Sequence, residues 1–340
     1  MSDETPEIDY KLQHSTFFEE TFKMPSLGIS FLKHFLPPEM VERLDIEKLT
    51  VEQEKLVDDV FRETRPDIVY HVPILGVDER VSFQVVLEHK SYDDHSAIFQ
   101  LWKYLGQLCI QDVKNRLADQ SWTKDFRLAP IVPIILHHGE TPFTGKTQLA
   151  ELFYPLPGAE RFLPRQEAIL VDLTTIDVDQ IPRDPDAPEL HVVMVILKII
   201  FSKDKELFKR KFCEIVEELQ PFTQNPRHYE LARGIWYYMI RYAKNMTKTD
   251  FHEVVTEVRK NVEEGDKMST LAQIFIDEGI ALGKTEGKAE GILRTLKWRF
   301  HAVPESLQAQ VPAITNLASL DDLADFAFVC ESLDDFAAAL

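Results

Sequence analysis

The segments PDIVYHV, residues 66–72, and VSFQVVLEHK, residues 81–90, decide the fold of this chain. The second segment alternates between two sets of side chains along its length, which is the pattern of a β-strand. The connection between the segments contains Gly76 and Asp78, residue types that favour turns. We therefore predict two neighbouring strands that pair as an antiparallel hairpin or meander.

Three polar side chains are placed to converge at one end of this pair of strands. Glu88 and Lys90 are two residues apart, so they project from the same face of their strand. Asp67 stands at the start of the neighbouring strand, and pairing can bring it beside Glu88. His89 projects from the opposite, apolar face.

Two carboxylates beside a lysine suit a divalent cation. Asp67 and Glu88 offer the oxygen ligands that Mg²⁺ and Mn²⁺ prefer, and the backbone carbonyl of His89 is a candidate third ligand. A metal held there stabilises phosphate charge and lowers the pKa of a bound water. Lys90 would neutralise developing negative charge, or orient the attacking water and help to deprotonate it. The alternative is a strand on which Glu88 makes only a surface salt bridge.

A helix is predicted from about His95 to Leu117, after the capping residues Ser91-Tyr-Asp-Asp94. Its apolar stripe includes Trp102, and its polar face carries Gln100 and Tyr104. These two side chains are four residues apart and so share one helix face. They could hydrogen-bond the metal ligands or a nucleic-acid backbone. The alternative is an ordinary polar helix face.

The rest of the chain predicts an α/β fold. Buried strands are expected at residues 129–137 and 168–173, and a helix broken near Met24-Pro25 is expected before the first strand. Together these segments predict a mixed sheet of four or five strands flanked by helices. After Pro188 the chain is predicted to be almost entirely helical. The expected domains cover residues 10–203, 204–267, 268–292 and 293–340.

Composition limits the class of protein. The chain has 340 residues, of which 44% are hydrophobic and 28% charged, so it is globular rather than wholly disordered. A formal net charge of -19 excludes a basic surface over the whole protein but allows a local basic patch. The three cysteines are far apart and suggest a reducing compartment. Neither a signal peptide nor a membrane span is predicted, so we expect a cytoplasmic protein.

The order of these motifs resembles the PD-(D/E)XK phosphodiesterase fold, and Gln100 with Tyr104 is similar to the Q-x-x-x-Y motif of its exonuclease-type subclass. Residues from about 10 to 292 resemble the bacterial Rpn, recombination-promoting nuclease, or transposase-like proteins. The matching stretches are residues 14–23, 31–39, 87–91 and 133–139. The resemblance implies a Mg²⁺-dependent DNA endonuclease linked to recombination or mobile-element biology.

This sequence also departs from that family's pattern. Ser15 stands where the family commonly has Asp, and Lys90 stands where it commonly has Gln. Lys90 matches the wider nuclease motif, while Glu19 or Glu20 could supply the missing acid. The rival interpretation is a non-catalytic interaction or DNA-tethering protein on a degenerate nuclease scaffold. The net charge of -19 favours the rival, and the intact Asp67, Glu88 and Lys90 favour the enzyme.

Four glycines follow one another at every fourth residue: Gly279, Gly283, Gly287 and Gly291. They would give a helix one face without side chains, where a second backbone could approach closely. Charged neighbours exclude a membrane dimer of the glycine-repeat type. We expect a self-associating helix that produces a homodimer, and a flexible tether is the alternative.

Several other polar residues are expected to have structural rather than catalytic roles. The adjacent His137 and His138 should point to opposite faces of a strand and serve the structure rather than a metal. A basic cluster could contact phosphates, but acids flank it and it is interpreted as a solvated helix face: Lys203, Lys205, Lys209, Arg210 and Lys211. His14 receives no role.

Overall fold

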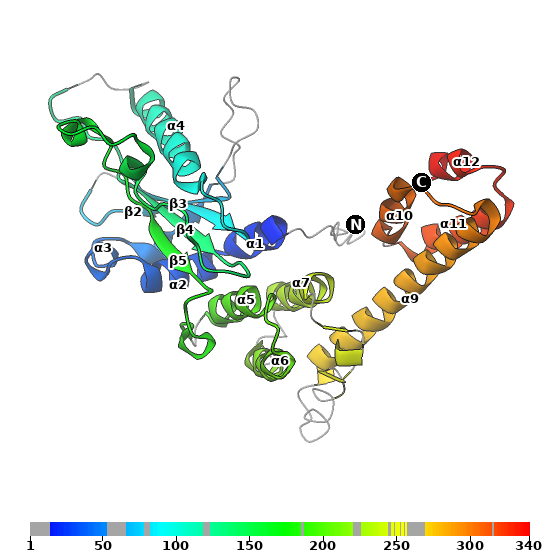
Figure 1. Ribbon diagram of the computed structural model, residues 1–340. Helices are drawn as coiled ribbons and strands as arrows, with labels where there is room; N and C mark the ends of the chain where they lie inside the picture. Colours follow the sequence, from blue (N-terminus) through cyan, green and yellow to red (C-terminus); the bar gives the residue numbers. More distant parts are fainter. Residues whose placement is uncertain are drawn as a thin grey trace. The chain divides into compact units, whose positions relative to one another are not determined.

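The computed structural model describes residues 14–52, 66–77, 82–117, 123–184, 187–219, 226–243, 246–247, 249–251, 253–254, 256, 269–314 and 316–340. These residues group into two compact units (Figure 1). The sheet unit lies within Gln13–Pro221 and Tyr238–Asp250, and the helical unit lies within Phe222–Tyr237 and Phe251–Leu340. No helix among the described residues is both long and apolar enough to cross a membrane.

The sheet unit contains five described strands in the spatial order β1-β2-β3-β4-β5. They are β1 Thr50–Val51, β2 Ile68–Pro73, β3 Ser82–Lys90, β4 Ile131–His137 and β5 Ile169–Asp172. The pairs β1/β2 and β2/β3 are antiparallel, whereas β3/β4 and β4/β5 are parallel. The predicted mixed sheet is therefore confirmed, and β3 lies at its centre with neighbours of both orientations.

Helices cover both faces of the sheet (Figure 1). The sheet unit holds α1 His14–Phe22, α2 Pro25–Phe35, α3 Pro38–Val41, α4 Ala97–Leu117, α5 Pro188–Ile199 and α6 Lys205–Leu219. The short 3-10 helices are η1 Ile46–Lys48, η2 Leu149–Leu152, η3 Glu160–Phe162 and η4 Val178–Gln180. Pro25 begins α2 and so accounts for the predicted break after α1.

Each face of the sheet has its own packing. On one face Leu101 and Leu105 of α4 pack with Val86 and Ile135. On the other face α2 approaches β2 so closely that a Cβ on Gly28 would lie 2.8 Å from the Tyr70 ring, which explains the need for glycine there. The two faces of β3 are therefore both buried.

The side chains that α4 buries differ from those that the sequence predicts. Trp102, expected on the apolar stripe, is 40% exposed. Tyr104, expected on the polar face, is only 4% exposed and belongs to the core cluster beneath α4. The ring of Tyr104 fits the core because its apolar body can be buried while its hydroxyl stays near polar groups.

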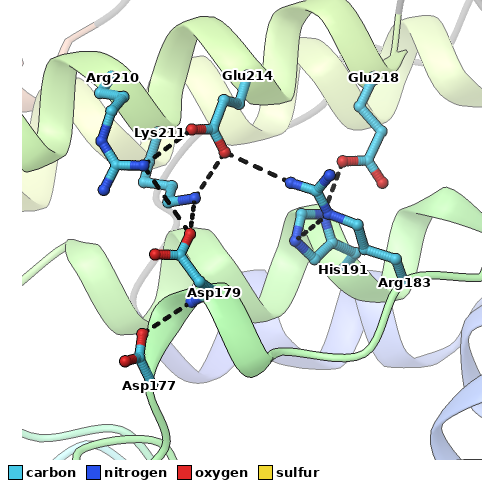
Figure 2. Close-up of polar contacts among 8 residues, drawn as sticks. All are labelled: Asp177, Asp179, Arg183, His191, Arg210, Lys211, Glu214 and Glu218. Atoms are coloured by element: carbon cyan, nitrogen blue, oxygen red, sulfur yellow. Dashed lines mark hydrogen bonds and ion pairs between the residues drawn. The ribbon is translucent and has the colours of Figure 1, made fainter.

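A dense ion-pair network joins η4 to α5 and α6 (Figure 2). Lys211 is 2% exposed, and its ammonium lies 2.5 Å from Asp179 and 2.6 Å from Glu214. His191 is also buried and lies 2.7 Å from Glu218. The interpretation of Lys211 as part of a solvated helix face is therefore wrong, because carboxylates from two elements let its charge enter the interior.

The helical unit is built on one long helix. It contains α9 Ser269–Phe300, α10 Glu305–Gln310, η6 Val311–Ala313, α11 Leu317–Val329 and α12 Leu333–Ala338, while α7 Pro226–Tyr242 has residues in both units. Ile292 and Leu296 of α9 pack with Leu320 and Phe336. Residues 252, 255 and 257–268, part of the stretch that the sequence predicts to be almost entirely helical, lie outside the described residues.

Helix α9 passes without interruption through the four-residue glycine period. Gly287 and Gly291 are exposed, and no atom lies within 4 Å of a Cβ placed on either. Helix α9 also continues through the expected domain boundary at residue 292. The homodimer and the domain boundaries stay predictions.

Candidate functional site

The register of β2 against β3 brings the two predicted acids together. Ile68 of β2 pairs with Leu87 of β3, and the two strands are antiparallel. The residue before Ile68, Asp67, therefore lies opposite the residue after Leu87, Glu88. Residues opposite one another in a sheet project from the same face. Asp67 is fixed there because its Oδ2 accepts a hydrogen bond of 2.7 Å from the backbone N–H of His89. The structure therefore brings Asp67 and Glu88 together, as the sequence predicts.

Lys90 joins the same group of side chains. Its Nζ lies 3.0 Å from Oε1 of Glu88, 2.9 Å from Oδ2 of Asp94 and 2.8 Å from Oε1 of Gln100. Burial lowers the pKa of Lys90, but the Glu88 and Asp94 carboxylates outweigh burial, and the pKa is raised overall. Lys90 therefore carries a fixed positive charge, which favours charge stabilisation over a role as a base.

Glu88 has one oxygen that the protein leaves unsatisfied. Its Oε2 is buried and has no hydrogen-bond partner among the described residues. Burial, and after it the charge of Asp67, raises the pKa of Glu88 to about 7. A buried carboxylate oxygen without a partner is costly, and a cation at this point would relieve both effects.

The backbone carbonyl of His89 is the third candidate oxygen ligand. The N–H of His89 points toward β2, and the carbonyl of a residue in a strand points to the same side as its N–H. The register places Pro66 opposite His89. Because proline has no N–H, it cannot donate to the His89 carbonyl across the strand pair. The proline therefore keeps that carbonyl available beside the carboxylates.

These groups fit a hard divalent cation. Two carboxylates and a carbonyl are all oxygen donors, and Mg²⁺ commonly binds one or two carboxylates and keeps several waters. Among the described residues, no group of three or more His, Cys, Asp or Glu side chains is placed to hold a metal ion. A metal at this site would accordingly rest on Asp67, Glu88 and the carbonyl of His89.

Helix α4 supplies the polar groups behind Lys90. Gln100 accepts from Lys90 through Oε1, and its Nε2 donates to Oγ of Ser96 at 2.8 Å. Burial, followed by the charges of Glu88 and Asp67, raises the pKa of the Tyr104 hydroxyl, which places that hydroxyl in the field of the site. The helix face that carries Gln100 and Tyr104 is thus turned toward the carboxylates.

Asp94 is a site residue that the sequence prediction treated only as a helix cap. It does cap α4, because its Oδ1 accepts from the N–H and the hydroxyl of Ser96. Its other oxygen contacts Lys90, and its pKa is lowered because these hydrogen bonds outweigh burial. The signal in the sequence was the spacing of Lys90 and Asp94, four residues apart with opposite charges.

Glu19 and Glu20 are not placed with the candidate ligands. Both pair with Lys23, at 3.7 Å and 3.0 Å. They belong to α1, whose Phe18 stacks on the His89 ring and therefore packs on the face of the sheet opposite Glu88. The suggestion that one of them replaces the acid missing at Ser15 gains no support.

The chain has recognisable relatives. Residues 12–227 match the family described as "Putative transposase, YhgA-like". The chain is 24% identical to the recombination-promoting nuclease RpnC of Escherichia coli K12, over 78% of this chain and 82% of that protein. It is 22% identical to RpnA of the same strain, over 78% and 84%. It is 21% identical to a protein named as the inactive recombination-promoting nuclease-like protein RpnE, over 83% and 87%. No solved structure matches the chain significantly.

Proposed function

Because the chain belongs to the YhgA-like transposase family, we propose that it is a Mg²⁺-dependent DNA endonuclease with a PD-(D/E)XK-type site, acting in recombination or mobile-element biology. The observation that carries the proposal is the placement of Asp67 opposite Glu88, with Lys90 bound to Glu88 and one Glu88 oxygen left without a partner. We place this activity in the cytoplasm, with Mn²⁺ as an alternative metal.

Each residue has a separate task in this proposal. Asp67, Glu88 and the carbonyl of His89 would hold the metal, which would stabilise phosphate charge and lower the pKa of a water. Lys90, which its neighbours keep charged, lies against the negative charge that develops on the phosphate. Gln100 fixes the position of the Lys90 ammonium through its side-chain oxygen.

The rival function is a non-catalytic interaction or DNA-tethering protein on the same scaffold. Two facts favour it: the net charge of -19, and the name of RpnE, which describes an inactive protein at a similar identity. Against it stands the unsatisfied oxygen of Glu88, which a purely structural ion pair with Lys90 does not explain.

The test is DNA cleavage by the purified full-length protein. Supercoiled and linear DNA are incubated with Mg²⁺, Mn²⁺, Ca²⁺ or chelator, and nicked and linear products are measured. We expect cleavage with Mg²⁺ or Mn²⁺ that Asp67→Ala and Glu88→Ala abolish together with metal binding. Lys90→Ala should keep metal binding and lose rate, because Lys90 is not a ligand.

A matched control is Glu20→Gln, which removes an exposed carboxylate on α1 and should cleave like wild type. Equal nicking by wild type and Asp67→Ala would identify a contaminating nuclease and defeat the proposal. Metal binding without any cleavage would favour the non-catalytic rival.

A further inference from the structure

A continuous chain of hydrogen-bonded side chains runs through the core on the far side of β3. Nε2 of His89 lies 2.8 Å from Nδ1 of His138, whose Nε2 lies 3.2 Å from the hydroxyl of Tyr238. The same hydroxyl lies 2.6 Å from Nδ1 of His14. The four residues, which we call the His-Tyr chain, come from β3, the residue after β4, α7 and α1.

The His-Tyr chain is enclosed by aromatic rings. Phe18 stacks on His89 with ring centroids 4.5 Å apart, and Phe17 stacks on Tyr238 at 4.1 Å. His89, His138 and Tyr238 are 7%, 1% and 0% exposed. Water cannot readily replace a lost partner in such an environment, so these ring nitrogens depend on one another.

The facing ring nitrogens of His89 and His138 share a single proton, because one of them must donate the hydrogen bond and the other must accept it. When each link holds one proton, only two arrangements also give the Tyr238 hydroxyl proton a partner within the chain. Protons point either from His89 toward His14 or in the reverse direction. In both arrangements the Tyr238 hydroxyl donates to one histidine and accepts from the other.

Two members of the chain are tied to the candidate site through the backbone. The N–H of His89 holds the Asp67 carboxylate, and the carbonyl of His89 lies on the same side. The N–H of His138 donates to the carbonyl of Lys90 at 2.9 Å. The orientation of these two rings therefore bears on the end of β3 where Asp67, Glu88 and Lys90 meet.

We propose that Tyr238 is a positioning residue for this site, because its hydroxyl closes the His-Tyr chain that fixes His89 and His138 behind the metal ligands. Tyr238 lies beyond residues 12–227, the segment that matches the family, so the proposal extends the functional unit into α7. The proposal rests on the proposed function for its catalytic consequence, but its structural consequence can be measured separately.

The chain offers a matched pair of variants. Tyr238→Phe removes only the hydroxyl and keeps the ring that stacks on Phe17. Tyr242→Phe removes a hydroxyl from the same aromatic cluster, where the Tyr242 ring lies 4.3 Å from His14, outside the His-Tyr chain. A general loss of packing or of tyrosine hydroxyls would therefore affect both variants.

The first measurement is metal binding and cleavage by the full-length variants, at a temperature well below the unfolding transition of each. We expect Tyr238→Phe to bind Ca²⁺ or Mn²⁺ about tenfold more weakly and to lose about tenfold in kcat, in the range found for groups that support metal ligands. KM for DNA should not change, since no substrate contact is removed. Tyr242→Phe should match wild type, and equal losses in both variants would overturn the proposal.

The second measurement needs neither metal nor substrate. In ¹⁵N spectra of the histidine rings, we expect His89 and His138 to be single neutral tautomers, with one proton shared between their facing nitrogens. Tyr238→Phe should mix the tautomers of His138 and speed hydrogen exchange of the amides at residues 89 and 138. If wild type neither binds metal nor cleaves DNA, the proposed function fails. The spectra still test the His-Tyr chain in that case, because they need neither metal nor substrate. Unchanged spectra and exchange in Tyr238→Phe would refute it.

Discussion

Replacing Glu88 by glutamine should stabilise the metal-free protein while it abolishes metal binding. The pKa of Glu88 is raised from 4.5 to about 7, so the folded protein resists ionisation of this carboxyl. One pKa unit corresponds to 1.36 kcal/mol, so the ionised side chain costs the folded state about 3 kcal/mol. Glutamine has nearly the shape of the protonated acid and never ionises.

The sign of the pH dependence follows from the raised pKa. The wild-type free energy of unfolding should fall as pH rises from about 4.5 to about 7, because the folded state then loses a proton that it holds more tightly than the unfolded chain does. Glu88→Gln lacks this loss. The variant should exceed wild type by about 3 kcal/mol at pH 8, and the difference should vanish near pH 4.5.

Urea unfolding in chelator, followed by circular dichroism across this pH range, measures the effect. Glu20→Gln serves as the control, because the Glu20 carboxylate is exposed and its ion pair with Lys23 lies at the surface. Mg²⁺ at about 100 times its Kd should then stabilise wild type by about 2.7 kcal/mol and leave Glu88→Gln unchanged. A variant no more stable than wild type at pH 8 in chelator would refute the reasoning.

Three further predictions concern other parts of the molecule. Gln100→Ala should act mildly, lowering the rate about fivefold for the loss of one hydrogen bond to Lys90, as steady-state kinetics can show, and Tyr104 should be tested as Tyr104→Phe because its ring is part of the core. Lys211→Ala should lower the free energy of unfolding by about 3 kcal/mol, because it empties the space of the buried side chain. Lys211→Met should lower it by less than about 1 kcal/mol, because methionine fills that space and the Asp179 and Glu214 carboxylates still reach solvent. Gly287→Leu and Gly291→Leu should raise helix stability in α9 yet abolish the homodimer in light scattering, and a dimer that survives them would remove the glycine face from the interface.

The fold was largely predictable because its strongest signals are local. Alternation along residues 81–90 and the apolar runs near residues 131–137 and 169–172 located the core strands. Strand β1 has only two residues and carries no periodic signal, so nothing in the sequence could reveal it. The buried ring of Tyr104 and the exposed ring of Trp102 depend on how α4 is rotated against the sheet, which tertiary packing decides.

The candidate site was predictable where it depends on strand geometry. Spacing alone put Glu88 and Lys90 on one face, and antiparallel pairing put Asp67 beside them. The roles of these residues stay predictions. Asp94 was missed because a capping aspartate already has a satisfactory local explanation. His14 was missed because a single histidine in a helix gives no sign of a partner 224 residues away.

That separation has a consequence for how the molecule is made. The contact between Asp67 and His89 spans 22 residues and can form as soon as the hairpin has left the ribosome. The contact between His14 and Tyr238 spans 224 residues, so it must wait until α7 has been synthesised. At roughly 5–20 residues per second, Tyr238 follows the hairpin by about 7 to 30 seconds. During that interval the nascent chain can bring its two acids together, but the rings behind them still lack their last partner.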